Sequence, residues 1–194
     1  MIHFVGAGPG APDLITLRGA KLLGEAGMII YAGSLVNKEL LALAKQGCPV
    51  YDSASMTLDE VVEKFREAEA AGVDTVRLHT GDPSIYGAIR EQMDRLEALG
   101  IEYDVTPGVS SFCAAAAAAR AEYTLPGVSQ TGINTRLEGR PPVPETEKNR
   151  SLAAHLASMV TYLALGLVRL PVPQQIAGSR LTAPARRDPH TPTS

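Results

Sequence analysis

The stretch Val5-Gly-Ala-Gly-Pro-Gly-Ala-Pro-Asp-Leu-Ile-Thr16 decides the fold. The apolar residues 2–5 run into its glycines, which is typical of a short buried strand in a parallel sheet. After the prolines, residues 13–26 carry leucines at helical spacing, and Asp13 or Thr16 is suited to cap that helix. The chain is therefore predicted to open with a strand, a glycine turn and a helix.

The same pattern continues up to residue 121. Short apolar runs alternate with amphipathic segments, and this alternation predicts a parallel α/β sheet covered by helices. Further strands are expected at residues 28–32, 50–51, 75–78 and 102–105. Further helices are expected at residues 38–44, 58–71, 85–99 and 110–121.

Prolines break this pattern between residues 124 and 150, where one strand near residues 129–135 is expected, followed by a linker. A new strand–helix unit is expected over residues 151–163. The sequence thus predicts a Rossmann-like N-terminal α/β domain followed by an incomplete second α/β domain. The expected boundaries are 1–123 for the first domain, 124–150 for the strand and Pro-rich linker, 151–169 for the start of the second domain, and 170–194 for an atypical Pro-rich tail.

Composition argues against several classes of protein. The net charge is −3 and aromatic residues make up 5% with no Trp, so neither a positive field nor a base-stacking platform is expected, and no nucleic acid partner is predicted. No apolar run reaches the roughly 18 residues that a membrane helix needs. The two cysteines and four histidines lack metal-ligand spacing, so no metal site is predicted. A cytoplasmic enzyme is the expectation.

The glycine turn has two readings. Gly6, Gly8 and Ala11 satisfy the dinucleotide-binding fingerprint with Ala at its third site. However, Pro9 and Pro12 remove amide donors that a pyrophosphate needs, and Tyr31-Ala-Gly-Ser34 stands where a ribose-binding acidic residue is expected. A tight strand-to-helix turn and a ligand-binding loop therefore both stay open.

Two more predicted strands end in small or polar residues. Gly81-Asp82-Pro83 follows one of them, and Asp82 could hold ribose hydroxyls or an ammonium group, or cap a helix that begins near Ser84. Pro107-Gly-Val-Ser-Ser111 follows the other, where Gly108 allows close backbone approach and Ser110 could be a helix cap. Because parallel strands end at one edge of a sheet, these turns are expected to form one site.

Three stretches resemble the tetrapyrrole (corrin/porphyrin) methylase family: residues 5–16 quoted above, His79-Thr-Gly-Asp-Pro-Ser-Ile-Tyr-Gly87 and Thr106-Pro-Gly-Val-Ser-Ser111. Thr135-Arg-Leu-Glu-Gly-Arg-Pro-Pro-Val-Pro-Glu145 and Tyr31-Ala-Gly-Ser-Leu-Val36 resemble its precorrin-4 branch. The resemblance extends over about residues 1–169.

The resemblance implies a homodimer of two-domain α/β subunits that uses S-adenosyl-L-methionine as cofactor. It implies methyl transfer to carbon 11 of precorrin-4, or of its cobalt form, in cobalamin biosynthesis. The cofactor-binding residues that it implies are Pro9, Thr80, Gly81, Asp82, Ile85, Ser110, Ser111 and Leu163.

The tetrapyrrole substrate carries several carboxylates, and arginine forks bind carboxylates well. Arg90, Arg136 and Arg140 are candidates to pair with them, although composition alone favours a solvated surface loop for the last two. Gly8 is expected to border the macrocycle. Asp82 and Glu138 are candidates for a general base or for charge placement.

Two alternatives accompany this reading. The second domain is shorter than the family pattern and is expected to be truncated, so a catalytically inactive remnant of such an enzyme is one alternative. An NAD-binding oxidoreductase resting on Gly6, Gly8 and Ala11 is the other.

Overall fold

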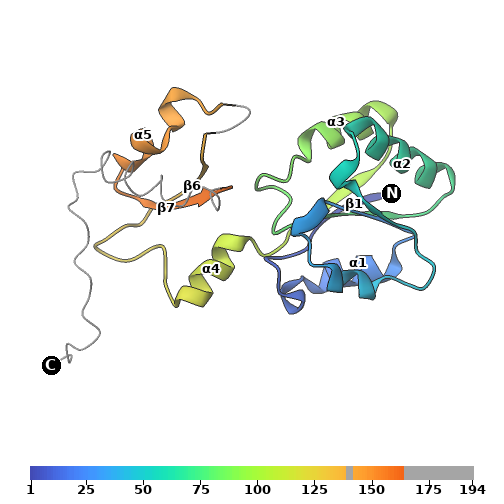
Figure 1. The fold of residues 1–194 in the computed structure, drawn as a ribbon, viewed down its shortest axis with the longest axis horizontal. Coiled ribbons are helices and arrows are strands. Elements are labelled where there is room, and N and C mark those ends of the chain that lie inside the picture. The colour runs from blue at the N-terminus through green and yellow to red at the C-terminus, as the bar shows by residue number, and fades with distance from the viewer. Residues whose placement is uncertain (139–141, 164–194) are drawn as a thin grey trace. The chain divides into compact units, whose positions relative to one another are not determined.

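The computed structural model describes residues 1–138 and 142–163, which form two compact units, Met1–Ala119 and a second that begins at Arg120 (Figure 1). The predicted Pro-rich tail at 170–194, the last six residues of the segment predicted at 151–169, and Arg140 lie outside the described residues. No helix in the described part is long and apolar enough to cross a membrane.

The first unit is built on a five-stranded parallel sheet with the order β3-β2-β4-β1-β5. Its strands are β1 (Ile2–Gly6), β2 (Met28–Tyr31), β3 (Val50–Asp52), β4 (Thr75–His79) and β5 (Tyr103–Thr106). Its α-helices are α1 (Leu17–Glu25), α2 (Leu58–Ala70), α3 (Arg90–Leu99) and α4 (Ser111–Ala119). Short 3-10 helices lie at Pro12–Leu14, Gly33–Leu35, Lys38–Leu43 and Ser53–Ser55. The predicted parallel α/β sheet is confirmed.

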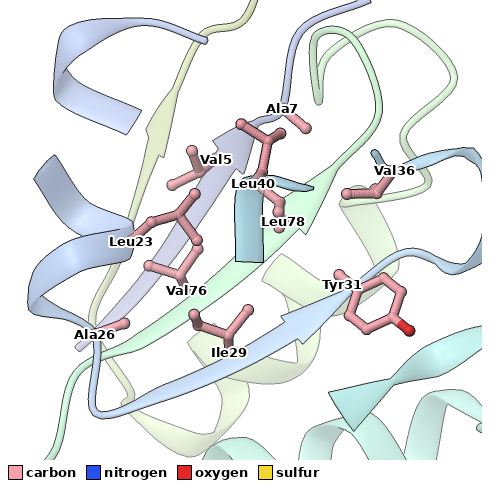
Figure 2. Close-up of a cluster of buried hydrophobic side chains, with 10 residues drawn as sticks. All are labelled: Val5, Ala7, Leu23, Ala26, Ile29, Tyr31, Val36, Leu40, Val76 and Leu78. Atoms are coloured by element: carbon pink, nitrogen blue, oxygen red, sulfur yellow. The ribbon is translucent and has the colours of Figure 1, made fainter. Parts of the chain in front are cut away.

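One face of this sheet packs against α1. Leu23 from the helix meets the apolar side chains that β1, β2 and β4 turn to this side, and Leu40 closes the cluster (Figure 2). Alternation along each strand places these residues on one face and their neighbours on the other. The buried members of this cluster are Val5, Ala7, Leu23, Ala26, Ile29, Tyr31, Val36, Leu40, Val76 and Leu78.

The opposite face is covered by α2 and α3 (Figure 1). Phe4 and Phe65 are fully buried there with an edge-to-face ring contact at 6.4 Å, and Leu96 joins them from α3. On β4 this face carries Arg77 and His79, both buried, instead of apolar side chains. The second core is therefore partly polar where it meets α3.

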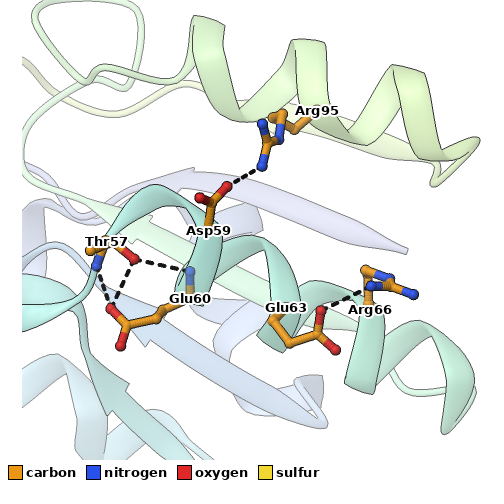
Figure 3. Close-up of polar contacts among 6 residues, drawn as sticks. All are labelled: Thr57, Asp59, Glu60, Glu63, Arg66 and Arg95. Carbon is orange, nitrogen blue, oxygen red and sulfur yellow. Dashed lines mark hydrogen bonds and ion pairs between the residues drawn. The ribbon is translucent and has the colours of Figure 1, made fainter.

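Local signals explain where the helices begin and end. Thr16 caps α1 by accepting a hydrogen bond from the Gly19 amide at 3.1 Å, which decides between the two predicted caps. Thr57 and Glu60 form a reciprocal capping box at the start of α2 (Figure 3). Gly100 ends α3 in a left-handed conformation.

The second unit contains a parallel pair of strands, β6 (Gly132–Arg136) and β7 (Ser158–Tyr162), with α5 (Asn149–Ala153) and a 3-10 helix at Glu145–Glu147 between them. The prediction of a strand–helix order over residues 151–163 was wrong, because here the helix comes first and the strand follows. Residues 158–162 instead pair with β6, whose predicted position at 129–135 was nearly right.

The helix predicted at residues 85–99 begins only at Arg90. Tyr86 and Ala88 adopt left-handed conformations, with φ of 57° and 52°, which an α-helix cannot contain. Residues 80–89 are therefore a loop between β4 and α3, which we call the β4–α3 loop. Ile85 lies in this loop and not on a helix.

Replacing Phe65 by Ala is expected to lower the free energy of unfolding by about 3–5 kcal/mol, because the ring is fully buried and its loss leaves a cavity. Urea denaturation measures the change. The control is Leu17→Ala, since that side chain is 92% exposed on α1. Similar losses in the two variants would contradict the core assignment.

Candidate functional site

The order of the strands places a topological switch point between β1 and β4. These strands are neighbours, but the chain leaves β1 toward α1 on one face and leaves β4 toward α3 on the other. In open parallel sheets, ligands bind beyond the carboxyl ends of strands at such a switch point. The predicted glycine turns follow these two strands and the next strand along the sheet, β5.

The backbones of the turns after β1, β4 and β5 come so close that no side chain fits between them. A Cβ on Gly6 would lie 2.5 Å from the Gly108 Cα, and a Cβ on Gly108 would lie 2.1 Å from the Gly81 carbonyl oxygen. Real Cβ atoms do not approach other atoms this closely, so Gly6 and Gly108 have no space for a side chain. Gly81 has space for a Cβ, but its left-handed φ of 63° favours glycine there. We call Gly6, Gly81 and Gly108 the glycine junction.

Hydrogen bonds join the first two turns directly. The Gly8 amide donates to the Gly81 carbonyl at 3.2 Å, the Gly81 amide donates back to Gly8 at 2.8 Å, and the Ala7 amide donates to His79 at 2.7 Å. These amides are consumed within the protein, and Pro9 has none to offer. The amides of Ala7 and Gly8 are therefore not free for a pyrophosphate, and the dinucleotide alternative gains no support from the geometry.

Asp82 ties the β4–α3 loop to the turn after β5. Its Oδ2 accepts a hydrogen bond from the Gly108 amide at 2.9 Å, and its Oδ1 accepts from the Ser84 amide at 2.8 Å and from the Ser84 hydroxyl. Partial burial raises the pKa of Asp82, but these donated hydrogen bonds outweigh it and leave the pKa below its ordinary value. The carboxylate is thus ionised and caps a turn, not the helix α3.

The turn after β5 lies beside Gly81. A Cβ on Gly81 would lie 3.7 Å from the Ser110 Cα and 3.8 Å from the Ser111 nitrogen. Ser110 is buried and its carbonyl accepts the first helical hydrogen bonds of α4. The structure thus brings together the predicted residues Gly8, Gly81, Asp82, Ser110 and Ser111. Pro9, Thr80 and Ile85 belong to the same turns and are partly buried.

Gly8 is the one substrate-binding candidate that belongs to these turns, and the other described candidates come from other elements. Arg90 is 70% exposed on α3 and forms an ion pair with Asp94 four residues further along the helix. Arg136 ends β6, where its guanidinium donates to the Leu137 carbonyl at 3.2 Å, and Glu138 is exposed just beyond it. Leu163 follows β7 and is 71% exposed.

Arg136 pairs in register with Tyr162, so the carboxyl ends of β6 and β7 lie side by side. Arg136, Glu138 and Leu163 therefore gather at one edge of the second unit's sheet. In both units, the candidate residues therefore lie where neighbouring parallel strands end at the same edge of a sheet.

Sequence reasoning missed two side chains that hold these turns. Asn37 donates to the Gly10 carbonyl at 2.8 Å while its Oδ1 caps the next 3-10 helix. Its place before the predicted helix at 38–44 is a cap signal that could have identified it. Gln92 contacts the end of the β4–α3 loop, and no pattern in the sequence indicates that contact.

Metal ligands do not gather in this region. Within residues 1–138 and 142–163, no group of three or more His, Cys, Asp or Glu side chains could hold a metal ion. His79, the histidine nearest in sequence to the glycine junction, is buried against the ring of Phe4. Burial and the neighbouring Arg77 charge lower the pKa of His79 to about 3, so it is neutral.

A family model described as Tetrapyrrole (Corrin/Porphyrin) Methylases matches residues 1–176. The chain belongs to the tetrapyrrole methylase family. Among curated proteins of this family, it is 52% identical to a cobalt-precorrin-4 C(11)-methyltransferase of Methanocaldococcus jannaschii, over 91% of this chain and 68% of that protein. It is 48% identical to the enzyme of that name from Priestia megaterium, over 87% of this chain and 65% of the relative. The chain thus spans about two thirds of the length of these relatives.

Solved structures of tetrapyrrole methylases share the fold. The X-ray structure of a cobalt precorrin-4 methyltransferase matches with a TM-score of 0.88 and 46% identity, over 92% of this chain and 75% of that one. A uroporphyrin-III C-methyltransferase from Thermus thermophilus, in complex with S-adenosyl homocysteine, matches with a TM-score of 0.72 and 28% identity, over 91% and 72%.

Gly108→Ala is expected to lower the free energy of unfolding by about 1–3 kcal/mol, because the new methyl group collides with the Gly81 carbonyl and forces the turns apart. Gly132→Ala is the matched control, since a Cβ there meets nothing within 4 Å. Urea denaturation compares the two. Equal effects would show that the glycine junction is not tightly packed.

Asp82→Asn is expected to destabilise the protein at pH 7, because an amide cannot accept hydrogen bonds on both of its terminal atoms. The pKa of Asp82 is lowered in the folded protein, so its ionised form stabilises the fold above the ordinary pKa of about 3.9. This stabilisation is lost as the pH falls through the lowered pKa. The difference between variant and wild type should therefore shrink below pH 4, as urea denaturation at several pH values measures. A difference that stays constant down to pH 2 would contradict this role.

Proposed function

We propose that this protein transfers a methyl group from S-adenosyl-L-methionine to carbon 11 of precorrin-4 or of its cobalt form. The main support is the glycine junction at the switch point of the sheet, where three turns meet at one edge. The identity of 52% and 48% to proteins named for this reaction supports the choice of substrate.

The turns suit this methyl donor better than a dinucleotide. S-adenosyl-L-methionine carries an adenosine and a sulfonium but no phosphate, so it needs no anion cradle. The amides of Gly8 and Gly81 are paired with one another's carbonyls, and Pro9 has no amide, so none of these three residues offers a donor to a phosphate. The ionised carboxylate of Asp82 adds a negative charge beside the glycine junction. The related structure with bound S-adenosyl homocysteine also supports this donor.

The cofactor would supply an activated methyl group, and the protein would supply alignment. Fixing two reactants in the right geometry can contribute about 7–11 kcal/mol to catalysis. Asp82 is suited to this task because it fastens the β4–α3 loop to the turn after β5. Its low pKa and its engaged oxygens make it a poor general base, so we assign it positioning and charge placement.

The cofactor contacts proposed in the first unit are Pro9, Thr80, Gly81, Asp82, Ile85, Ser110 and Ser111, with Leu163 from the second unit. The proposed tetrapyrrole contacts are Gly8, Arg90, Arg136 and Arg140, with Glu138 as the second candidate base. Arg90 would have to exchange its exposed partner Asp94 for a substrate carboxylate, a small cost because exposed ion pairs are weak.

Assembly and location belong to the same proposal. We propose a homodimer, as the family resemblance implies, and a cytoplasmic location, as the composition of the chain suggests. Light scattering after gel filtration measures the mass of the assembly directly, and a monomer at all concentrations would contradict the dimer.

The function is tested by incubating the protein with precorrin-4 and S-adenosyl-L-methionine and measuring the intact mass of the tetrapyrrole. One added methyl group is expected, absent when the donor is omitted. Calorimetry with S-adenosylhomocysteine provides a separate measure of donor binding. A folded protein that binds this compound but adds no methyl group would instead identify the inactive remnant, and one that does not bind it would overturn the proposal.

A further inference from the structure

The β4–α3 loop is held at its second end by a side chain from α3. The loop begins at Thr80, where Asp82 anchors it, and ends at Ile89. Near that end, Gln92 donates a hydrogen bond from its Nε2 to the Ala88 carbonyl at 3.0 Å. The Gln92 side chain is buried, whereas Ala88 is exposed, so the bond connects the core to the surface loop.

The second half of this loop needs an anchor. Ala88 and Tyr86 adopt left-handed conformations, which non-glycine residues avoid and which persist only where the surroundings enforce them. Gly87 lies so close to Pro83 that a Cβ would stand 2.1 Å from its carbonyl oxygen. The loop is therefore folded tightly on itself. The Gln92 side chain holds the Ala88 carbonyl, just before α3 begins.

The other end of the Gln92 amide reaches a buried cation. Its Oε1 accepts a hydrogen bond from the Arg77 Nε at 3.0 Å, and Arg77 also donates to the Ile30 carbonyl at 3.3 Å. No carboxylate among the described residues forms an ion pair with Arg77. Burial lowers the pKa of Arg77 to about 10, so the guanidinium is still charged at neutral pH.

We infer that Gln92 is a positioning residue, which couples the buried Arg77 of β4 to Ala88 and so sets the shape of the donor-binding loop. The inference rests on the proposed function, because that function gives the loop its ligand. The two ends of the Gln92 amide have different roles. The oxygen accepts a hydrogen bond from the buried Arg77, and the nitrogen donates one to Ala88 in the loop.

Gln92→Glu separates the two tasks. A glutamate keeps the acceptor for Arg77 and adds a negative charge that a buried, unpaired guanidinium lacks. It removes the donor to Ala88 and sets an oxygen against the Ala88 carbonyl. The variant should therefore unfold at the same or a higher urea concentration than wild type, while its Kd for S-adenosylhomocysteine rises about three- to tenfold, the value of one hydrogen bond.

A purely structural role for Gln92 predicts that stability and binding fall together. Such a parallel loss, or an unchanged Kd, would overturn the inference. Gln46→Glu makes the same chemical change at an exposed position and should alter neither quantity.

Hydrogen exchange tests the hydrogen bond from Gln92 to Ala88 in the absence of a ligand. In Gln92→Glu, the amides of residues 85–89 should exchange faster, while those of β4 keep their protection. If wild type fails to bind S-adenosylhomocysteine, the proposed function falls, and the exchange rates still decide whether Gln92 holds the loop. Unchanged exchange at residues 85–89 would overturn it.

Discussion

The close approach of three backbones at the ends of β1, β4 and β5 is the constraint on which the rest of the site depends. Gly6 and Gly108 leave no room for a Cβ and Gly81 is left-handed, and this close approach lets the turns share hydrogen bonds. Asp82 can reach the Gly108 amide only because these turns lie so close together. The helices on either face hold the strands in the register that brings the glycines together.

The central strands β1, β2 and β4 could be predicted closely because each is a short run buried along its whole length. The observed β2 and β4, Met28–Tyr31 and Thr75–His79, differ by one residue from the predicted runs. The gathering of the turns was also predictable, since parallel strands end at one edge. The site residues in these turns are consistent with that rule, although their contacts with a ligand stay predictions.

Two features could not be read from the sequence. The start of α3 depends on left-handed Tyr86 and Ala88, and nothing in their side chains signals this conformation, which tertiary contacts impose. The partners of Arg77 were equally hidden, because a buried arginine on a central strand contradicts the usual apolar pattern. In the second unit, the order of α5 and β7 was mistaken because a short apolar segment gives little sign of which element it forms.

The mutual pairing of Gly8 and Gly81 has a consequence for recognition. Because these backbone groups hydrogen-bond with each other, the turns after β1 and β4 are already ordered before any small molecule binds. Preorganised surfaces avoid the entropy that a mobile loop loses on association, so more of each contact is available as affinity. The rigidity of these turns thereby favours recognition by shape, with little change in their conformation when a ligand binds.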